Sequence, residues 1–160
     1  MNITVEEKLM YKVMKAIYDS GISISFKGSM VLKACLIEAG YSEETRHTVD
    51  IDANWNSDTS PSADQMTNSL QRALEKSGID LDVSIYRMYG EGRSSGFELT
   101  ERSTGEILFS MVNMNLSSSP NSIIRLKASH KDSSGSMYVS GKACIRSFIS
   151  RLFIREMYCA

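Results

Sequence analysis

The sequence predicts an α/β or α+β domain, with one mixed β-sheet and flanking helices. Three observations lead to this class. Helical and β-like segments alternate over residues 5–76, and three β-like segments then follow with no helix between them. The composition, with 42% hydrophobic and 23% charged residues in a chain of 160, is that of a globular domain.

The first two elements are a helix and a strand. Apolar residues recur at helical spacing over residues 5–19, and Thr4 with Glu7 forms a capping-box pattern at the start of that segment. Gly21 is placed to end the helix. Residues 22–26 alternate apolar side chains with serines, which predicts a strand.

A second helix is predicted to begin after the turn at Lys27-Gly28-Ser29 and to end at Gly40. The remaining elements follow from apolar periodicity and from glycine-marked turns. In chain order they are a strand at 48–55, a helix at 61–76 that begins with Pro61, strands at 80–89, 95–101 and 106–116, an edge strand at 122–128 and a helix at 142–158.

The charge is distributed unevenly along the chain. Residues 1–119 carry 11 Lys+Arg and 17 Asp+Glu, whereas residues 120–160 carry 7 and 2, within a net charge of −1. We therefore expect a core domain at 1–119 and a basic, serine-rich tail at 120–160. The helix of this tail is expected to pack on the core or on a partner, and an anionic partner is the alternative.

Several classes of protein are excluded. No apolar run approaches the roughly 18 residues of a membrane-spanning helix, and the first ten residues are not a secretory signal. We expect a cytoplasmic protein with no membrane partner. Cys35, Cys144 and Cys159 are odd in number and widely spaced, which argues against a disulfide framework and a zinc site. Cys35 is predicted to lie in the core.

The first candidate functional motif is the strand-to-helix turn Phe26–Met30. The free N–H groups and the dipole of a helix start favour an anion such as a phosphate. Gly28 allows the backbone to approach a ligand closely, and the Ser29 hydroxyl is suited to bond a phosphate oxygen. The alternative is that Gly28 and Ser29 serve only to cap the helix.

The second motif is the pair Asp50 and Asp52 on the next strand. Residues two apart on a strand point to the same face, whereas Ile51 points to the other. Two carboxylates on one face repel each other unless a cation lies between them. Mg²⁺ relieves this repulsion, because it takes oxygen ligands and also bridges the phosphates of a substrate.

Together the two motifs resemble those of the nucleotidyltransferase superfamily, which has the polymerase-β-like fold. The closer resemblance is to the AbiEii/AbiGii toxin-type nucleotidyltransferases of abortive-infection and toxin–antitoxin systems, and it covers about 26–55. Their pattern is an aromatic-Lys-Gly-Gly/Ser turn, a helix, an arginine-containing stretch and then D-[ILF]-D. Here it falls on Phe26, Lys27, Gly28, Ser29, Arg46, Asp50, Ile51 and Asp52.

The resemblance implies a Mg²⁺-dependent enzyme that moves an NMP from an NTP to an RNA, such as tRNA, or to a protein acceptor. It implies that Asp50 and Asp52 are the catalytic residues and the metal ligands. It also implies that Lys27, Gly28, Ser29 and Arg46 bind the nucleotide. A cognate antitoxin is a further implied partner, and an oligomer is compatible with the sequence.

The sequence departs from the family pattern at the third carboxylate, which is expected beside the aspartate pair on the strand at 107–116. That strand has no acid, and Asn113 and Asn115 stand in its place. The substitutes from neighbouring strands are Asp80, Asp82 and Glu98. The alternative function is therefore a catalytically impaired nucleotidyltransferase-fold binding or interaction module. A DxD glycosyltransferase is a third hypothesis.

Three further residues have two interpretations each. Trp55 and Tyr41 are candidates to stack on a nucleobase, with packing in the core or at its rim as the alternative. His47 is a candidate substrate contact, with a plain surface histidine as the alternative. We favour the structural interpretation for all three.

Overall fold

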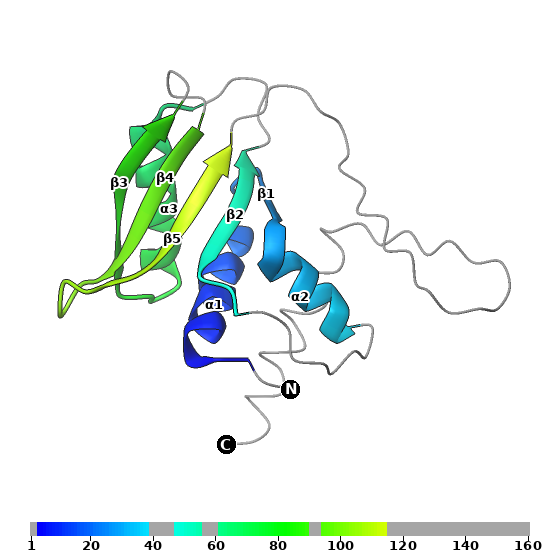
Figure 1. The fold of residues 1–160 in the computed structure, drawn as a ribbon. Helices are drawn as coiled ribbons and strands as arrows, with labels where there is room; N and C mark the ends of the chain where they lie inside the picture. The colour runs from blue at the N-terminus through cyan, green and yellow to red at the C-terminus, as the bar shows by residue number, and fades with distance from the viewer. Residues whose placement is uncertain (1–2, 39–46, 56–60, 90–93, 115–160) are drawn as a thin grey trace, which may run out of the picture.

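The computed structural model describes residues 3–38, 47–55, 61–89 and 94–114. In these described ranges helices and strands alternate at first, and three consecutive strands then follow (Figure 1). In order they are α1 (Val5–Asp19), β1 (Ile24–Lys27), α2 (Gly28–Glu38), β2 (Asp50–Trp55), α3 (Ala63–Lys76), β3 (Leu81–Tyr89), β4 (Ser94–Glu101) and β5 (Ile107–Met114).

The five strands within the described residues form one mixed sheet in the order β1-β2-β5-β4-β3. β2 and β5 are parallel, and the other three pairs are antiparallel. Strands β3, β4 and β5 form a meander, and β5 lies in the middle of the sheet beside β2 (Figure 1). This arrangement places β5 next to the aspartate pair of β2, the position that the resemblance implied for the strand predicted at 107–116.

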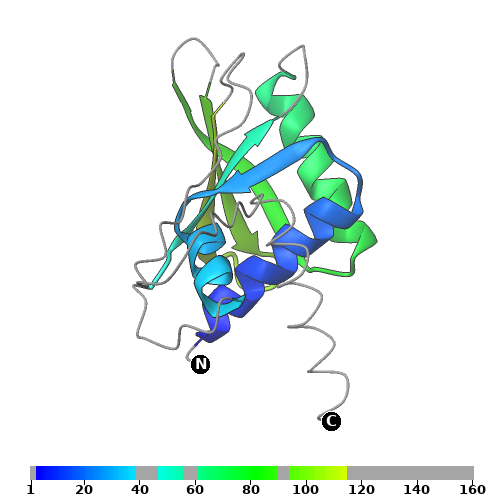
Figure 2. The same ribbon diagram turned by 90° about the vertical axis from the view of Figure 1, so that its right-hand side faces the viewer.

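Helices α1 and α3 lie together on one face of the sheet, as both ribbon views show (Figures 1 and 2). Beneath them the strands present fully buried side chains, among them Ile51, Phe97 and Leu99. Helix α2 contacts β1 and β2 and contributes further core residues, which include Cys35. The core therefore occupies one face of the sheet and continues under α2.

Two buried polar contacts fix the position of α2. The Glu7 carboxylate of α1 accepts hydrogen bonds from Lys33 Nζ at 2.7 Å and from the Thr48 backbone N–H at 3.3 Å. Glu7 and Lys33 are 0% and 4% exposed. The Tyr11 hydroxyl of α1 donates to the Met30 carbonyl in the first turn of α2 at 3.0 Å. Helix α2 is thus attached to α1 at both of these positions.

The mixed sheet with flanking helices confirms the predicted fold class. The capping box expected at Thr4 and Glu7 is present, and Cys35 is buried. Within the part of the chain that the structure describes, no helix is both long and apolar enough to cross a membrane. The predicted edge strand at 122–128 and the tail at 120–160, with its helix, lie outside the described residues.

Candidate functional site

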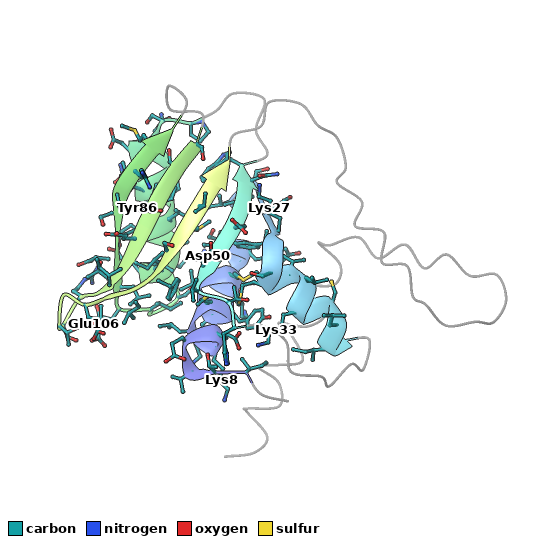
Figure 3. All side chains as sticks on the ribbon, viewed as in Figure 1. Lys8, Lys27, Lys33, Asp50, Tyr86 and Glu106 are labelled. Atoms are coloured by element: carbon teal, nitrogen blue, oxygen red, sulfur yellow. The ribbon has the colours of Figure 1, made fainter. Side chains whose placement is uncertain are left out.

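The two motifs singled out in the sequence lie against each other. β1 passes directly into α2, so that Lys27 is the last residue of the strand and Gly28 the first of the helix. β1 and β2 are antiparallel neighbours, with Lys27 opposite Asp52. The start of α2 is therefore beside the aspartate pair, and Figure 3 shows Lys27 and Asp50 at this part of the sheet.

Gly28 of the first motif lies against Asp52 of the second. Its φ is +74°, in the left-handed region that favours glycine. A Cβ atom built on Gly28 would lie 2.2 Å from Asp52 Oδ2 and 3.0 Å from Asp52 Cγ. The Asp52 carboxylate therefore occupies the space that any other side chain would need at the start of α2.

Two negatively charged side chains, Asp50 and Asp52, lie close together at this site. Partial burial raises the pKa of Asp52, and the neighbouring Asp50 raises it further, whereas Lys27 opposes the shift. Helix α2 contributes the positive end of its dipole at the same place, and its first turn contains no acidic residue. The charged Asp52 carboxylate is thus held in a position where a cation would stabilise it.

Asp50 and Asp52 point away from the core, because Ile51 and Ala53 between and after them are fully buried on the other face. Both aspartates are partly exposed. Two carboxylates on one strand face suit a Mg²⁺ ion that completes its octahedron with water and phosphate oxygens. Asp50 and Asp52 therefore fit two of the ligand positions around such an ion.

Within the part of the chain that the structure describes, no third carboxylate lies beside the pair. In the parallel register Asp50 lies opposite Ser110 and Asp52 opposite Val112, while Asn113 is paired with Ala53. Among residues 3–38, 47–55, 61–89 and 94–114, no group of three or more His, Cys, Asp or Glu side chains could hold a metal ion. The described chain therefore supplies two acidic ligands at this position and no third.

The three acids considered as substitutes occupy different places. Glu98 is paired with Ser110, so it lies on the same face as Asp50 but two strands away, about 10 Å between Cα atoms. Asp80 and Asp82 bind the Arg102 guanidinium, at 3.3 and 2.7 Å. Only Glu98 therefore shares a face and a cross-strand row with the pair.

The other predicted site residues have mixed outcomes. Ser29 is exposed in the first turn of α2, beside Gly28, so its hydroxyl is accessible. Arg46, Tyr41 and Asn115 lie outside the described residues. Trp55 is partly buried against the hydrophobic core, which supports the packing interpretation of this residue.

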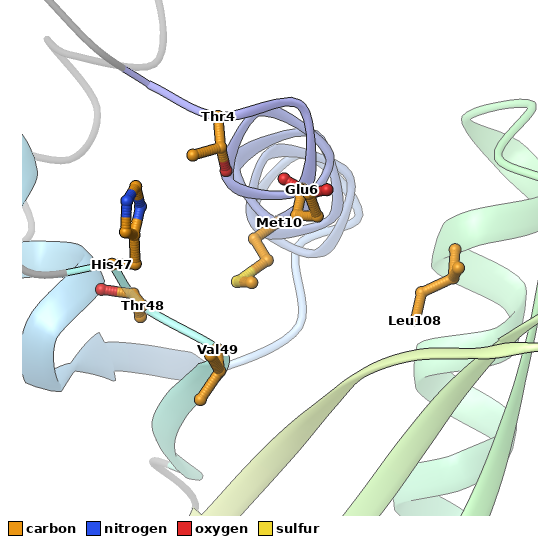
Figure 4. Close-up of a pocket in the computed structure, with 7 residues that line it drawn as sticks. All are labelled: Thr4, Glu6, Met10, His47, Thr48, Val49 and Leu108. Carbon is orange, nitrogen blue, oxygen red and sulfur yellow. The ribbon is translucent and has the colours of Figure 1, made fainter.

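A separate pocket of about 320 Å³ lies beside residues 47–49, which directly precede β2 (Figure 4). Met10 and Glu6 of α1 line it together with Leu108 of β5 and residues 47–49. His47 is an exposed part of this lining. Of the predicted nucleotide-binding and metal-binding residues that the structure describes, none lines this pocket, so His47 lines a pocket to which Asp52 and Gly28 do not contribute.

Sequence reasoning missed one feature of the site face, which is the contact between Tyr86 and Gly96. Tyr86 lies at an irregularity of β3, between Ile85 and Arg87, and its ring covers Gly96 of the neighbouring strand. A glycine inside a strand marks a position where another group approaches closely, so Gly96 was the available signal. The identity of the group that covers it could not be read from the sequence.

Comparison with known proteins identifies no relative. No protein-family model matches the sequence, and no curated protein or solved structure matches the chain either. The resemblance to nucleotidyltransferases therefore stays a prediction that depends on the motif residues over 26–55.

Proposed function

We propose that this protein is a cytoplasmic, Mg²⁺-dependent nucleotidyltransferase that moves an NMP from an NTP to a hydroxyl group of an RNA or protein acceptor. Asp50 and Asp52 would hold the metal, and the start of α2 at Gly28 and Ser29 would bind the phosphates. Lys27 and Arg46 would add positive charge toward the phosphates. A toxin–antitoxin or abortive-infection role is the biological setting that the motif resemblance suggests.

The observation that carries the proposal is the contact between Gly28 and Asp52. The space for a Cβ atom on Gly28 is filled by the Asp52 carboxylate, 2.2 Å away. A phosphate at the start of α2 would therefore lie directly beside a metal held by Asp52. Phosphate recognition at a helix start and metal binding by carboxylates need this adjacency in order to act on one substrate.

The proposed reaction forms one bond and breaks one. The acceptor oxygen bonds to the α-phosphorus, the bond from that phosphorus to the bridging oxygen breaks, and pyrophosphate leaves with the bonding electrons. The hydroxyl proton passes to solvent or to a carboxylate. Mg²⁺, when bound, supplies positive charge to the phosphate oxygens. The chain itself supplies orientation, through Gly28 and Ser29, and the carboxylates of Asp50 and Asp52.

Binding is tested first. Isothermal titration calorimetry with Mg²⁺ and each α,β-methylene NTP measures affinity without turnover. We expect binding by the wild type and its loss in Asp50→Asn and Asp52→Asn. Glu106→Gln is the matched control, because Glu106 is an exposed acid at the β4–β5 turn, away from the pair (Figure 3). Binding of no nucleotide by folded wild-type protein contradicts the proposal.

Transfer is tested with two positions of the label. With α-³²P NTP and total tRNA or cell protein, a nucleotidyltransferase leaves the label on the acceptor. With γ-³²P NTP the label leaves as pyrophosphate. We expect labelling from the α position only, and none with Asp52→Asn. Labelling from the γ position would instead identify a kinase and contradict the proposed reaction.

The second candidate function is a nucleotide-binding module of the same fold that lacks transfer activity. The register favours it, because Ser110 and Val112 rather than an acid lie opposite the aspartate pair. This candidate predicts calorimetric binding that depends on Asp52, together with no label transfer to any acceptor. The same two assays therefore separate the two functions.

A further inference from the structure

Tyr86 is an exposed aromatic residue held in a defined position on the sheet. It lies where the β3–β4 register shifts, between Ile85 and Arg87. A Cβ atom built on Gly96 would lie 2.5 Å from Tyr86 Cε1 and 2.9 Å from Cζ. The ring therefore rests on the bare backbone of Gly96, yet 41% of the Tyr86 surface remains exposed.

The ring lies on the same face of the sheet as the aspartate pair. Gly96 is paired with Val112, and Val112 is paired with Asp52. Partners in register point to one face, so the Gly96 Cβ direction, in which the Tyr86 ring lies, is also the direction of the Asp52 side chain. Figure 3 shows Tyr86 and Asp50 labelled across this face.

The separation suits a single nucleotide. Gly96 and Asp52 are two strands apart, which is about 10 Å between their Cα atoms. A nucleotide whose phosphates lie at the aspartate pair extends its sugar and base over such a distance. Helices α1 and α3 cover the opposite face (Figures 1 and 2), so neither of them obstructs this path.

We propose that the Tyr86 ring, seated on Gly96, is a stacking surface for a nucleobase whose phosphate end reaches Asp50 and Asp52. The proposal rests on the proposed function, which places phosphates at the aspartate pair. The base belongs to the NTP or to the end of an RNA acceptor, and the ligand chemistry is the same in both cases. Aromatic stacking is tolerant of base identity, because every base has a π-face.

A purely structural role for Tyr86 makes different predictions. An aromatic side chain that covers a glycine also stabilises a sheet. Tyr86→Leu keeps an apolar cover over Gly96 but removes the aromatic face, whereas Tyr86→Phe keeps both. Tyr18 of α1 is the matched control, because it is a tyrosine of similar exposure, 43%, on a different element.

The experiment has one arm for each source of the base. The first measures calorimetric affinity for Mg²⁺ with each α,β-methylene NTP and, as a ligand without a base, with inorganic triphosphate. The second measures fluorescence anisotropy with a short single-stranded RNA that ends in a normal or an abasic nucleotide. Melting temperature reports the structural effect of every variant in parallel.

We expect Tyr86→Leu to weaken binding of the NTP, the RNA or both by about 5- to 100-fold. Binding of triphosphate and abasic RNA should be unchanged, and Tyr86→Phe and Tyr18→Leu should bind like the wild type. Equal weakening of ligands with and without a base, or no weakening of either, overturns the proposal. The arm in which the loss occurs identifies the source of the base.

The two proposals fail in distinguishable ways. If Asp52→Asn abolishes NTP binding while Tyr86→Leu has no base-dependent effect, the proposed function stands and the stacking surface is wrong. If Tyr86→Leu has the base-dependent effect while Asp50 and Asp52 variants bind nucleotide normally, stacking is supported and the proposed function is wrong. If the wild type binds neither a nucleotide nor RNA, both the proposed function and the stacking surface are wrong.

Discussion

Replacing Gly28 with alanine is the sharpest test of how the site is assembled. The new Cβ atom would lie 2.2 Å from Asp52 Oδ2, so the carboxylate would have to move. An L-residue at a φ of +74° costs roughly 1–2 kcal/mol, and the steric overlap adds about 1–3 kcal/mol. We expect Gly28→Ala to lower the free energy of unfolding by about 2–5 kcal/mol in urea denaturation.

A matched control separates backbone strain from the clash. Gly78 has a similar φ of +67°, and a Cβ atom there would meet nothing within 4 Å. Gly78→Ala should therefore cost only the roughly 1–2 kcal/mol of strain. The excess loss in Gly28→Ala should shrink when Asp52 is also replaced by alanine. Equal losses for the two glycine variants, or an excess that Asp52→Ala leaves intact, would refute the reasoning.

Two further predictions concern buried charge. Lys33→Met removes the cation from the buried Glu7 carboxylate, so the free energy of unfolding should fall by about 3–5 kcal/mol in urea denaturation. Burial by itself raises the pKa of Glu7, but its hydrogen bonds with Lys33, Thr4 and Thr48 outweigh burial and lower the pKa. The stabilisation that the charged Glu7 carboxylate gives should therefore be complete above about pH 4.3 and be lost as the pH falls through its lower pKa in the folded state. Glu7→Gln should not show this loss of stability in acid. Asp52→Asn should raise the melting temperature at pH 7 without Mg²⁺. Burial and Asp50 raise the pKa of Asp52, so its charged form destabilises the fold. Near pH 3, below the pKa of Asp52 in both the folded and the unfolded state, the wild type and Asp52→Asn should melt at the same temperature.

The sequence predicted the local elements because their signals are local. Helix α1 has the predicted bounds, since its apolar stripe and the capping box at Thr4 and Glu7 act within a few residues. Helix α3 begins two residues later than predicted, at Ala63, because the Ser62 side chain accepts a hydrogen bond from the Gln65 N–H and makes Ser62 the N-cap. β1 begins at Ile24 rather than at 22 and includes Lys27.

The candidate site was only partly predictable. The strand period of two correctly placed Asp50 and Asp52 on one face, opposite to Ile51. The contact between Gly28 and Asp52 could not be derived, because it depends on the antiparallel register of two strands that are separated by a helix. The packing of the Tyr86 ring on Gly96 likewise depends on an irregularity in β3, and the pattern of residues along the strand does not indicate this irregularity.

The buried contacts of α2 explain how a site with unfavourable charge keeps its geometry. Repulsion between Asp50 and Asp52 favours their separation, and Gly28 has no side chain that could restrain the start of the helix. Two residues further on, however, the Met30 carbonyl accepts a hydrogen bond from Tyr11, and Lys33 one turn later is held by Glu7. Since both partners belong to α1, which packs with α3 on the core face, the start of α2 is fixed to the core rather than to the aspartates. A cation at Asp50 and Asp52 would then bind a preformed arrangement, with little reorganisation of the backbone.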